Sequence, residues 1–230
     1  MQVLAPPLPW DKPRLREQNG ADVVVFLHGL WRSVWAMEPL ARDLHQRGFE
    51  TVNIPYASFR YDLDGIVAQI RGLLEESVEQ GRRVHFVTHS LGGVVVKRLL
   101  EQVQVEKIGR VVMLAPPHRG SEIVDWLSRS PARFVLGPAG EFLTSDKMSA
   151  HADHFPAGIE AGIIMGEKSA IPFFSRLLEA SNDGIVSVEK GRLFGIKEFK
   201  VVAADHTFIA SDPEVLAMVG RFLNEGIFED

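Results

Sequence analysis

The sequence predicts an α/β fold: a mostly parallel central sheet flanked by helices. Strand-like and helix-like segments alternate along the chain, the main strand-like segments are β-branched apolar runs, and a Gly or Pro residue ends several of the segments. The 46% of hydrophobic residues and the formal net charge of −5 are typical of a globular protein. No repeat or linker divides the 230 residues, so we expect a single domain over 1–230.

Each expected element has its own pattern. Residues 21–27 (ADVVVFL) are an unbroken apolar run, typical of a strand buried on both faces. Apolar residues at helical spacing predict amphipathic helices over 35–46 and 62–80, the second ended by Gly81. The remaining expected elements are strands at 50–54, 83–88, 110–115, 161–165 and 198–204, and helices at 91–103, 121–128 and 212–224.

Composition excludes several classes of function. The chain has no cysteine, which excludes disulfide scaffolds, zinc ribbons, iron–sulfur clusters and cysteine nucleophiles. The mildly acidic charge gives no electrostatic reason to bind nucleic acid or anionic lipid. Residues 1–20 form a Pro-rich leader without the features of a secretory signal, and no apolar run is long enough to cross a membrane. We therefore expect no integral membrane segment and a cytoplasmic protein by default, although a secreted protein whose signal has been removed would show the same features.

The sharpest local signal is Thr88-His89-Ser90-Leu91-Gly92, between an expected strand and an expected helix. In that context G-x-S-x-G predicts a nucleophile elbow, a tight turn that projects the serine hydroxyl above the sheet. Thr88 stands where the first glycine usually is, while Gly92 and Gly93 give the small neighbours that the turn needs. The alternative is a serine that merely caps a helix.

The strand that ends in Phe26-Leu27-His28-Gly29-Leu30 adds a second signal, and Ala115-Pro116-Pro117-His118 a weaker one. Together with the elbow, these segments resemble the α/β-hydrolase superfamily and its lipase-like esterases. The resemblance covers residues 21–223 and implies that the backbone N–H groups of Leu30 and Leu91 form the oxyanion hole. It also implies that the catalytic order is serine, then acid, then histidine.

A serine nucleophile needs a base, and that base needs an orienting carboxylate. Of the eight histidines, His206 alone follows the last expected strand and precedes the last helix, where the superfamily places its catalytic histidine. For the acid we favour Asp183, because Asn182-Asp183-Gly184-Ile185-Val186 is similar to a stretch of lipase-like hydrolases. A plain Asn-Asp-Gly turn is the alternative reading, and Asp205 is the rival carboxylate.

Residues 118–160 lack the regular strand–helix alternation of the rest of the chain, and we expect them to form a small cap or substrate loop. Its apolar residues either line an acyl pocket or fill a satellite core beneath a long loop. We expect Trp31, His89 and Trp126 to contact the substrate. His151-Ala152-Asp153-His154 lacks the spacing of a zinc motif, so we interpret it as a polar loop and expect no metal.

These observations predict a serine hydrolase that cleaves small-molecule or lipid carboxylic esters through Ser90, His206 and Asp183, without a cofactor. Two alternatives stay open. An acyltransferase would use the same triad with another acceptor in place of water, and a non-catalytic binding module would use the pocket as a receptor. The acyl chain, the alcohol and the oligomeric state are not encoded in any motif.

Overall fold

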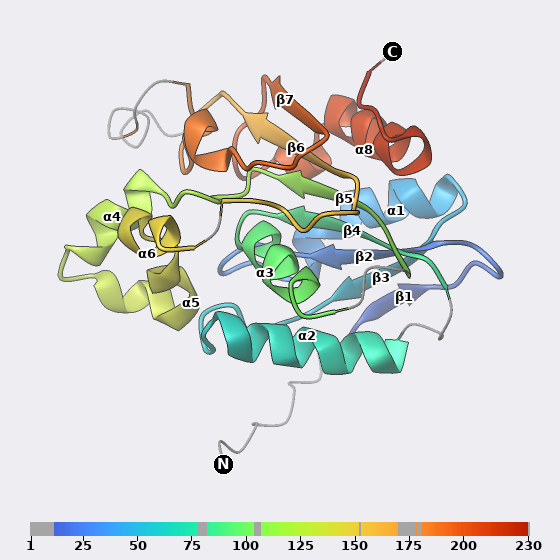
Figure 1. Ribbon diagram of the computed structural model, residues 1–230, viewed down its shortest axis with the longest axis horizontal. Helices are drawn as coiled ribbons and strands as arrows, with labels where there is room; N and C mark the ends of the chain where they lie inside the picture. Colours follow the sequence, from blue (N-terminus) through green and yellow to red (C-terminus); the bar gives the residue numbers. More distant parts are fainter. Residues whose placement is uncertain are drawn as a thin grey trace.

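A seven-stranded sheet forms the centre of the molecule (Figure 1). The structure is a computed structural model that describes residues 12–77, 82–103, 107–151, 153–169, 178 and 181–229. The strand order is β1-β3-β2-β4-β5-β6-β7; β1 is antiparallel to β3, and the other neighbouring pairs are parallel. The predicted fold class, a mostly parallel sheet flanked by helices, is confirmed.

The elements follow one another in the expected alternation. The strands are β1 (Arg14–Arg16), β2 (Val23–Leu27), β3 (Glu50–Ile54), β4 (Val84–His89), β5 (Ile108–Leu114), β6 (Ala161–Gly166) and β7 (Glu198–Val202). The helices are α1 (Glu38–Gln46), α2 (Leu63–Ser77), α3 (Leu91–Leu100), α4 (Glu122–Ser128), α5 (Gly137–Phe142), α6 (Ser145–Ser149) and α8 (Pro213–Glu225). The described residues also include four short 3-10 turns: η1 (Val34–Met37), η3 (Arg133–Leu136), η4 (Val188–Gly191) and η5 (Ile209–Ser211).

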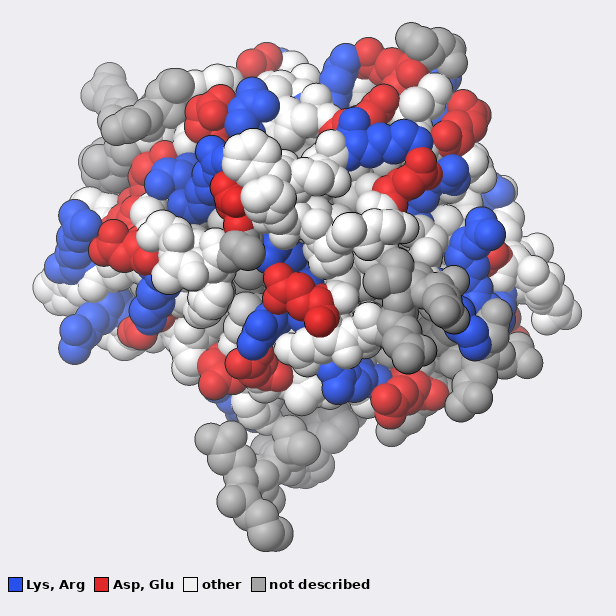
Figure 2. All heavy atoms as spheres, in the orientation of Figure 1, with Lys and Arg blue, Asp and Glu red and all other residues white. Residues whose placement is uncertain are grey.

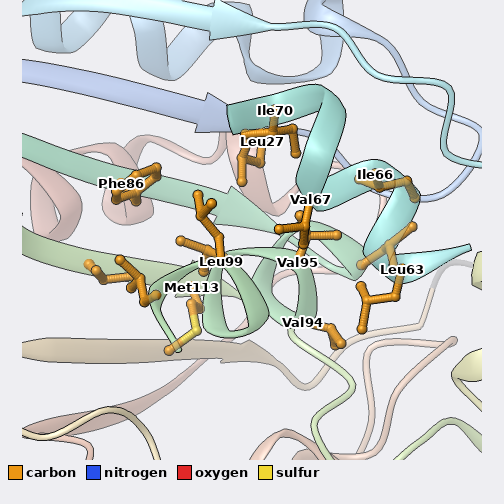
Figure 3. Packing of buried hydrophobic residues seen from close by; sticks show 14 of the residues in the cluster. Leu27, Leu63, Ile66, Val67, Ile70, Phe86, Val94, Val95, Leu99 and Met113 are labelled. Atoms are coloured by element: carbon orange, nitrogen blue, oxygen red, sulfur yellow. The ribbon is translucent and has the colours of Figure 1, made fainter. Parts of the chain in front are cut away.

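Helices cover both faces of the sheet, and the alternation of side chains along β2 shows how. Val25 and Leu27 belong to the core shared with α2 and α3, whereas Val24 and Phe26 belong to the core shared with α1 and α8. Figure 3 shows Leu27 among side chains of α2 and α3. A strand covered on both faces needs apolar residues at every position, which is why residues 23–27 lack the alternation of a half-exposed strand.

The structure differs from the sequence-based expectations in a few places. Residues 14–16, expected in the leader, form the edge strand β1. The expected helix over 35–46 divides into η1 and α1, with Pro39 in the first turn of α1. The helix expected over 91–103 ends at Leu100, and the expected end of the 62–80 helix lies outside the described residues.

The segment expected to be a cap or substrate loop, hereafter the cap, contains α4, η3, α5 and α6, where the sequence predicts a single helix. It follows β5 and lies at the end of the sheet where the parallel strands terminate (Figure 1). The Asp125 carboxylate accepts hydrogen bonds from the N–H and hydroxyl of Ser145 at 2.8 and 2.5 Å, joining α4 to α6. Val124 and Leu136 are buried in the core on the α2–α3 face, so the cap packs on the sheet domain through its own apolar side.

Candidate active site

Ser90 occupies a strained turn between β4 and α3. Its backbone has φ 52° and ψ −121°, a conformation that residues with a Cβ rarely adopt. Its N–H donates to the Leu114 carbonyl at 2.9 Å, and its carbonyl accepts from the Gly93 N–H at 2.9 Å. Strain of about 1–3 kcal/mol persists only where the surrounding structure holds it, and it is concentrated at functional sites.

Two glycines allow this turn to form. A Cβ on Gly92 would lie 2.5 Å from the Leu27 carbonyl oxygen, and a Cβ on Gly93 would lie 2.7 Å from the Cβ of Pro116. Both distances are closer than real carbon atoms approach, so α3 can start this near to β2 and β5 only with glycine at both positions. Thr88 fits at the position where the motif usually has its first glycine, and it is fully buried.

The structure brings Asp183 and His206 together. His206 Nδ1 lies 2.7 Å from Asp183 Oδ2, and the His206 N–H donates to the Asp183 carbonyl at 3.1 Å. The other oxygen, Asp183 Oδ1, accepts from the N–H groups of Ile185 and Val186 at 3.0 and 2.8 Å. The buried carboxylate is thus fixed by the turn that follows it, and a carboxylate in this position can orient an imidazole and stabilise its protonated form.

The carboxylate of Asp205, the other candidate acid, accepts hydrogen bonds from backbone N–H groups. Asp205 Oδ1 accepts hydrogen bonds from the N–H groups of Thr207 and Phe208, at 2.8 and 3.2 Å. Asp205 therefore holds the turn just after β7, and the carboxylate that accepts a hydrogen bond from Nδ1 of His206 is Asp183.

His89 links the elbow to the His206 loop. Its Nε2 lies 2.9 Å from the His206 carbonyl oxygen, and the centres of the two rings are 4.8 Å apart. Burial, followed by the proximity of His206, lowers the pKa of His89 well below its usual value. His89 is 3% exposed, so the side chain expected to contact the substrate is packed against the histidine loop.

The expected oxyanion-hole donors lie beside Ser90. A Cβ on Gly29 would lie 3.2 Å from the Ser90 Cβ, so the turn that carries Leu30 passes directly over the serine. Leu91 is the first residue of α3, and the N–H of a first helical residue has no acceptor within its helix. An N–H in that position can stabilise negative charge beside the serine.

Sequence reasoning missed Tyr56, which holds the His28-Gly29 turn. The Tyr56 hydroxyl donates to the His28 carbonyl, and its ring stacks on the His28 ring at 4.2 Å. His28 is buried, which lowers its pKa to about 4 and keeps its ring neutral. Tyr56 lies two residues after the end of β3, but no motif marks it.

Sequence reasoning also missed the contacts that join the cap to the segment that follows Asp183. The Ser121 hydroxyl donates to the Ile185 carbonyl at 2.6 Å, and the Ser187 hydroxyl donates to Glu122 at 2.7 Å. Lys190 Nζ donates to the Ser145 hydroxyl at 2.8 Å. These pairs are 45 to 65 residues apart in the chain, so no local pattern could indicate them.

Two of the residues expected to contact the substrate are at the surface. Trp31 is 54% exposed and Trp126 is 46% exposed. A cavity of about 570 Å³ opens between the cap and α3, lined in part by Val94, Phe142 and Met148. Val94 is one helical turn from Ser90, although none of the lining residues is Ser90, Asp183 or His206.

Of the cluster at 151–154, Ala152 lies outside the described residues, and His154 Nδ1 lies 3.0 Å from an Asp153 oxygen. Within the described ranges, no group of three or more His, Asp or Glu side chains is placed to hold a metal ion. His118 is a buried core residue, and burial lowers its pKa to about 3. None of the helices in the described ranges is both long and apolar enough to cross a membrane.

A strand–serine–helix elbow on a parallel sheet, beside a histidine paired with a buried carboxylate, is the arrangement of an α/β hydrolase. The chain belongs to the alpha/beta hydrolase family, whose model matches residues 24–183. No curated protein matches the chain at a significant level.

Solved structures of similar fold carry esterase and lipase names. Lipase BlEst2 from Bacillus licheniformis, in its mature form, is 23% identical with a TM-score of 0.74, over 87% of this chain and 93% of that chain. The metagenomic carboxyl esterase MGS0156 is 18% identical with a TM-score of 0.72, over 91% and 77%. Phospholipase PlaB from Legionella pneumophila is 16% identical with a TM-score of 0.69, over 88% and 56%. At these identities the similarity shows the fold.

Proposed function

We propose that the protein is a serine hydrolase of carboxylic esters. Ser90 attacks the acyl carbon, and Nε2 of His206 accepts the hydroxyl proton as the bond between serine oxygen and carbon forms. The N–H groups of Leu30 and Leu91 stabilise the oxyanion, and one such donor is typically worth about 10²–10³ in rate. His206 then gives its proton to the departing alcohol, which leaves an acyl-enzyme.

Water completes the reaction. His206 accepts a proton from the water that attacks the acyl-enzyme and returns it to Ser90 as the acid leaves. Throughout, Asp183 holds the imidazole through Nδ1 and stabilises its positive charge. The observation that carries the proposal is the strained Ser90 elbow beside a histidine whose other nitrogen is bound to a buried carboxylate.

Ester hydrolysis is favoured over other α/β-hydrolase reactions because similar folds include a lipase and a carboxyl esterase. The substrate is a small-molecule or lipid ester, and a cytoplasmic location remains a prediction from the sequence. The domain boundaries, with residues 118–160 as the cap, are part of the same proposal.

A series of p-nitrophenyl esters of increasing acyl length, run on the wild type and on Ser90→Ala, tests this function. We expect hydrolysis by the wild type at one or more chain lengths and background rates for the variant. Adding alcohol or amine acceptors to the same assay separates a hydrolase from an acyltransferase, since a transferase would form the new ester or amide. Equal rates for the two proteins would contradict the proposal.

A further inference from the structure

Residues 28–34, which follow β2 and include Leu30, are held by side chains from the end of β3. Asn53, Tyr56 and Ser58 are all buried there. Each forms a hydrogen bond with a backbone group of the 28–34 loop: the Tyr56 hydroxyl donates to the His28 carbonyl, the Trp31 N–H donates to the Ser58 hydroxyl at 3.0 Å, and the Asn53 amide donates to the Val34 carbonyl at 2.7 Å. One segment of the chain therefore fixes the loop at its start, middle and end.

The N–H of Leu30 is free, whereas the two N–H groups that follow it are not. The Trp31 N–H is bound to Ser58, and the Arg32 N–H donates to the Gly29 carbonyl at 3.2 Å. Among the described residues, the Leu30 N–H has no hydrogen-bond acceptor. An N–H that is left without a partner next to a serine nucleophile is available to an oxygen that gains negative charge there.

The direction of the Leu30 N–H follows from the Gly29 carbonyl, because both groups belong to the same peptide unit. This unit is trans, so its C=O and N–H point in opposite directions. The Gly29 carbonyl accepts hydrogen bonds from His28 Nδ1 at 2.9 Å and from the Arg32 N–H at 3.2 Å. Fixing the carbonyl on one side of the unit also fixes the N–H on the other.

Tyr56 holds the His28 ring, which makes the shorter of these two bonds. The two rings stack with their centres 4.2 Å apart, and the Tyr56 N–H donates to His28 Nε2 at 3.4 Å. Because a carbonyl can only accept, His28 carries its proton on Nδ1 and accepts at Nε2, as one tautomer of a neutral imidazole does. Burial lowers the pKa of His28 to about 4 and raises the pKa of Tyr56, so both side chains keep these roles near neutral pH.

Ser58 acts on the other side of Leu30, where the backbone is strained. Trp31 has φ 56°, in the left-handed region that bulky residues rarely adopt, and its side chain is too exposed for burial to hold it there. A residue in such a conformation persists only where its surroundings fix it. The hydrogen bond to Ser58 fixes the Trp31 N–H, which belongs to the peptide unit that begins at Leu30.

The cap packs against both the loop and the segment that holds it. A Cβ on Gly140 of α5 would lie 3.0 Å from Leu30 Cδ2, so α5 packs directly on the Leu30 side chain. Gly137, the first residue of α5, has no room for a Cβ beside the carbonyl of Phe59, the residue after Ser58. The cap therefore restricts movement of the loop and of its support.

We propose that Tyr56 and Ser58 are positioning residues that direct the Leu30 N–H toward the oxyanion. Tyr56 acts through the His28 ring and the Gly29 carbonyl, and Ser58 acts through the strained backbone of Trp31. This role rests on the proposed function, in which the Leu30 N–H stabilises the negatively charged oxygen of the tetrahedral intermediate. Neither side chain takes or gives a proton in the reaction.

The hydrogen bonds from Tyr56 and to Ser58 join neutral groups. On the face shown in Figure 2, by contrast, acidic and basic side chains lie intermixed over α2 and α3, and ion pairs such as Arg98 with Asp64 account for part of this mixture. Salt screens exposed charges of that kind but has little effect on buried hydrogen bonds between neutral groups. The contributions of Tyr56 and Ser58 to the rate should therefore not depend on ionic strength.

The test compares the full-length wild type with Tyr56→Phe, Ser58→Ala and the double variant. Tyr56→Phe removes the hydroxyl and keeps a ring that can stack, and Ser58→Ala removes the acceptor of the Trp31 N–H. The matched control is Tyr61→Phe, because Tyr61 is the other tyrosine of the chain and packs against the core on the α2–α3 face, outside these hydrogen bonds. Circular dichroism and thermal melting show whether each protein folds.

Two measurements report on the oxyanion. Steady-state kinetics on a soluble p-nitrophenyl ester separate kcat from KM. Inhibition by an alkyl trifluoromethyl ketone measures a stable analogue of the tetrahedral intermediate. In that adduct the Ser90 oxygen bonds to the ketone carbon, the serine proton moves to His206, and the ketone oxygen becomes the oxyanion.

We expect each single variant to lower kcat about 10-fold with little change in KM, and to weaken inhibition by the ketone by a similar factor. The double variant should lose no more than removal of one donor costs, roughly 10²–10³, because both residues act on the same N–H. The losses should be equal at low and high salt, and the pH dependence of kcat, which His206 sets, should not move. Tyr61→Phe should match the wild type.

An active wild type whose Tyr56 and Ser58 variants equal it would overturn the positioning role and leave the proposed function intact. A loss confined to KM, a shifted pH dependence or an equal loss in Tyr61→Phe would also overturn it, because these results indicate substrate binding, the base or general stability. If one single variant fails to fold, the other decides. A wild type that neither hydrolyses the ester nor binds the ketone would overturn the proposed function and the positioning role together.

Discussion

His89 Nε2 and the carbonyl oxygen of His206 lie 2.9 Å apart, which joins the residue before Ser90 to the backbone of the loop that carries His206. A carbonyl only accepts, so His89 donates and carries its proton on Nε2. The lowered pKa of His89 keeps the ring neutral and this donor in place near neutral pH. We infer that His89 is a positioning residue: it fixes the loop that holds His206 relative to Ser90.

This relationship predicts the effect of changing His89. His89→Ala should lower kcat by about 100-fold with little change in KM, because a small displacement of a catalytic base is costly. His89→Gln, whose amide can donate to the same carbonyl, should recover part of the loss. Steady-state kinetics on a soluble ester measure both. A rise in KM at unchanged kcat would instead assign His89 to substrate binding, as the sequence alone indicated.

The two candidate acids can be separated by matched substitutions. Asp183→Asn should lower kcat by roughly 10⁴, as loss of the orienting acid does in the Ser-His-Asp triad of serine proteases. Asp205→Asn should be far milder, because the Asp205 carboxylate accepts hydrogen bonds from the backbone N–H groups of Thr207 and Phe208. Circular dichroism shows whether each variant folds. A larger loss of kcat in Asp205→Asn than in Asp183→Asn would identify Asp205 as the catalytic acid.

Buried histidines should make the protein sensitive to mild acid. The pKa of His28 is lowered to about 4 and that of His118 to about 3, whereas unfolded histidines titrate near 6.5. The unfolded chain therefore binds more protons below pH 6.5, so the free energy of unfolding falls as the pH drops through this window. Each of the two histidines should cost about 2 kcal/mol at pH 5.

Denaturant unfolding at pH 7 and pH 5 measures this loss. His118→Gln provides the matched variant, since it removes one buried imidazole that has no part in the proposed reaction. Its stability should fall less between the two pH values than that of the wild type. If the free energy of unfolding had the same pH dependence in both proteins, His118 would not be a source of the acid sensitivity.

Trp126 tests the role of the cap. Trp126→Ala should change the preferred acyl chain length more than it changes the melting temperature, since the side chain is about half exposed on a helix that packs through Val124. Phe194→Ala, an exposed aromatic residue elsewhere, is the control. A variant that loses stability but keeps its chain-length profile would support a satellite core and contradict the substrate-lining role.

The sequence predicted the elements that have local patterns. The buried strand at 23–27 and the elbow at Ser90 each follow from a few consecutive residues, because burial on both faces or a tight turn restricts which side chains fit. Strand β1 was missed because its three residues gain their structure from pairing with β3. Pairing of this kind leaves no periodicity in the strand itself.

The candidate active site likewise combines residues that lie in local sequence patterns with residues that are brought in by contacts between distant parts of the chain. Local patterns mark Asp183 and His206 as candidates, whereas only the structure shows that it is Asp183 rather than Asp205 whose carboxylate lies 2.7 Å from the His206 imidazole. Tyr56 acts through stacking on His28, a contact between loops 28 residues apart. The path of the cap depends on packing and on hydrogen bonds such as the one from Ser121 to Ile185, which local sequence does not encode.

The most direct measurement is covalent labelling by a fluorophosphonate probe, which reacts with activated serines, followed by mass spectrometry of the labelled peptide. The account predicts one modified residue, Ser90, no labelling in Ser90→Ala, and strongly reduced labelling in a folded His206→Ala protein. Labelling that persists unchanged in Ser90→Ala would contradict the assignment of Ser90 as the nucleophile and, with it, the proposed mechanism.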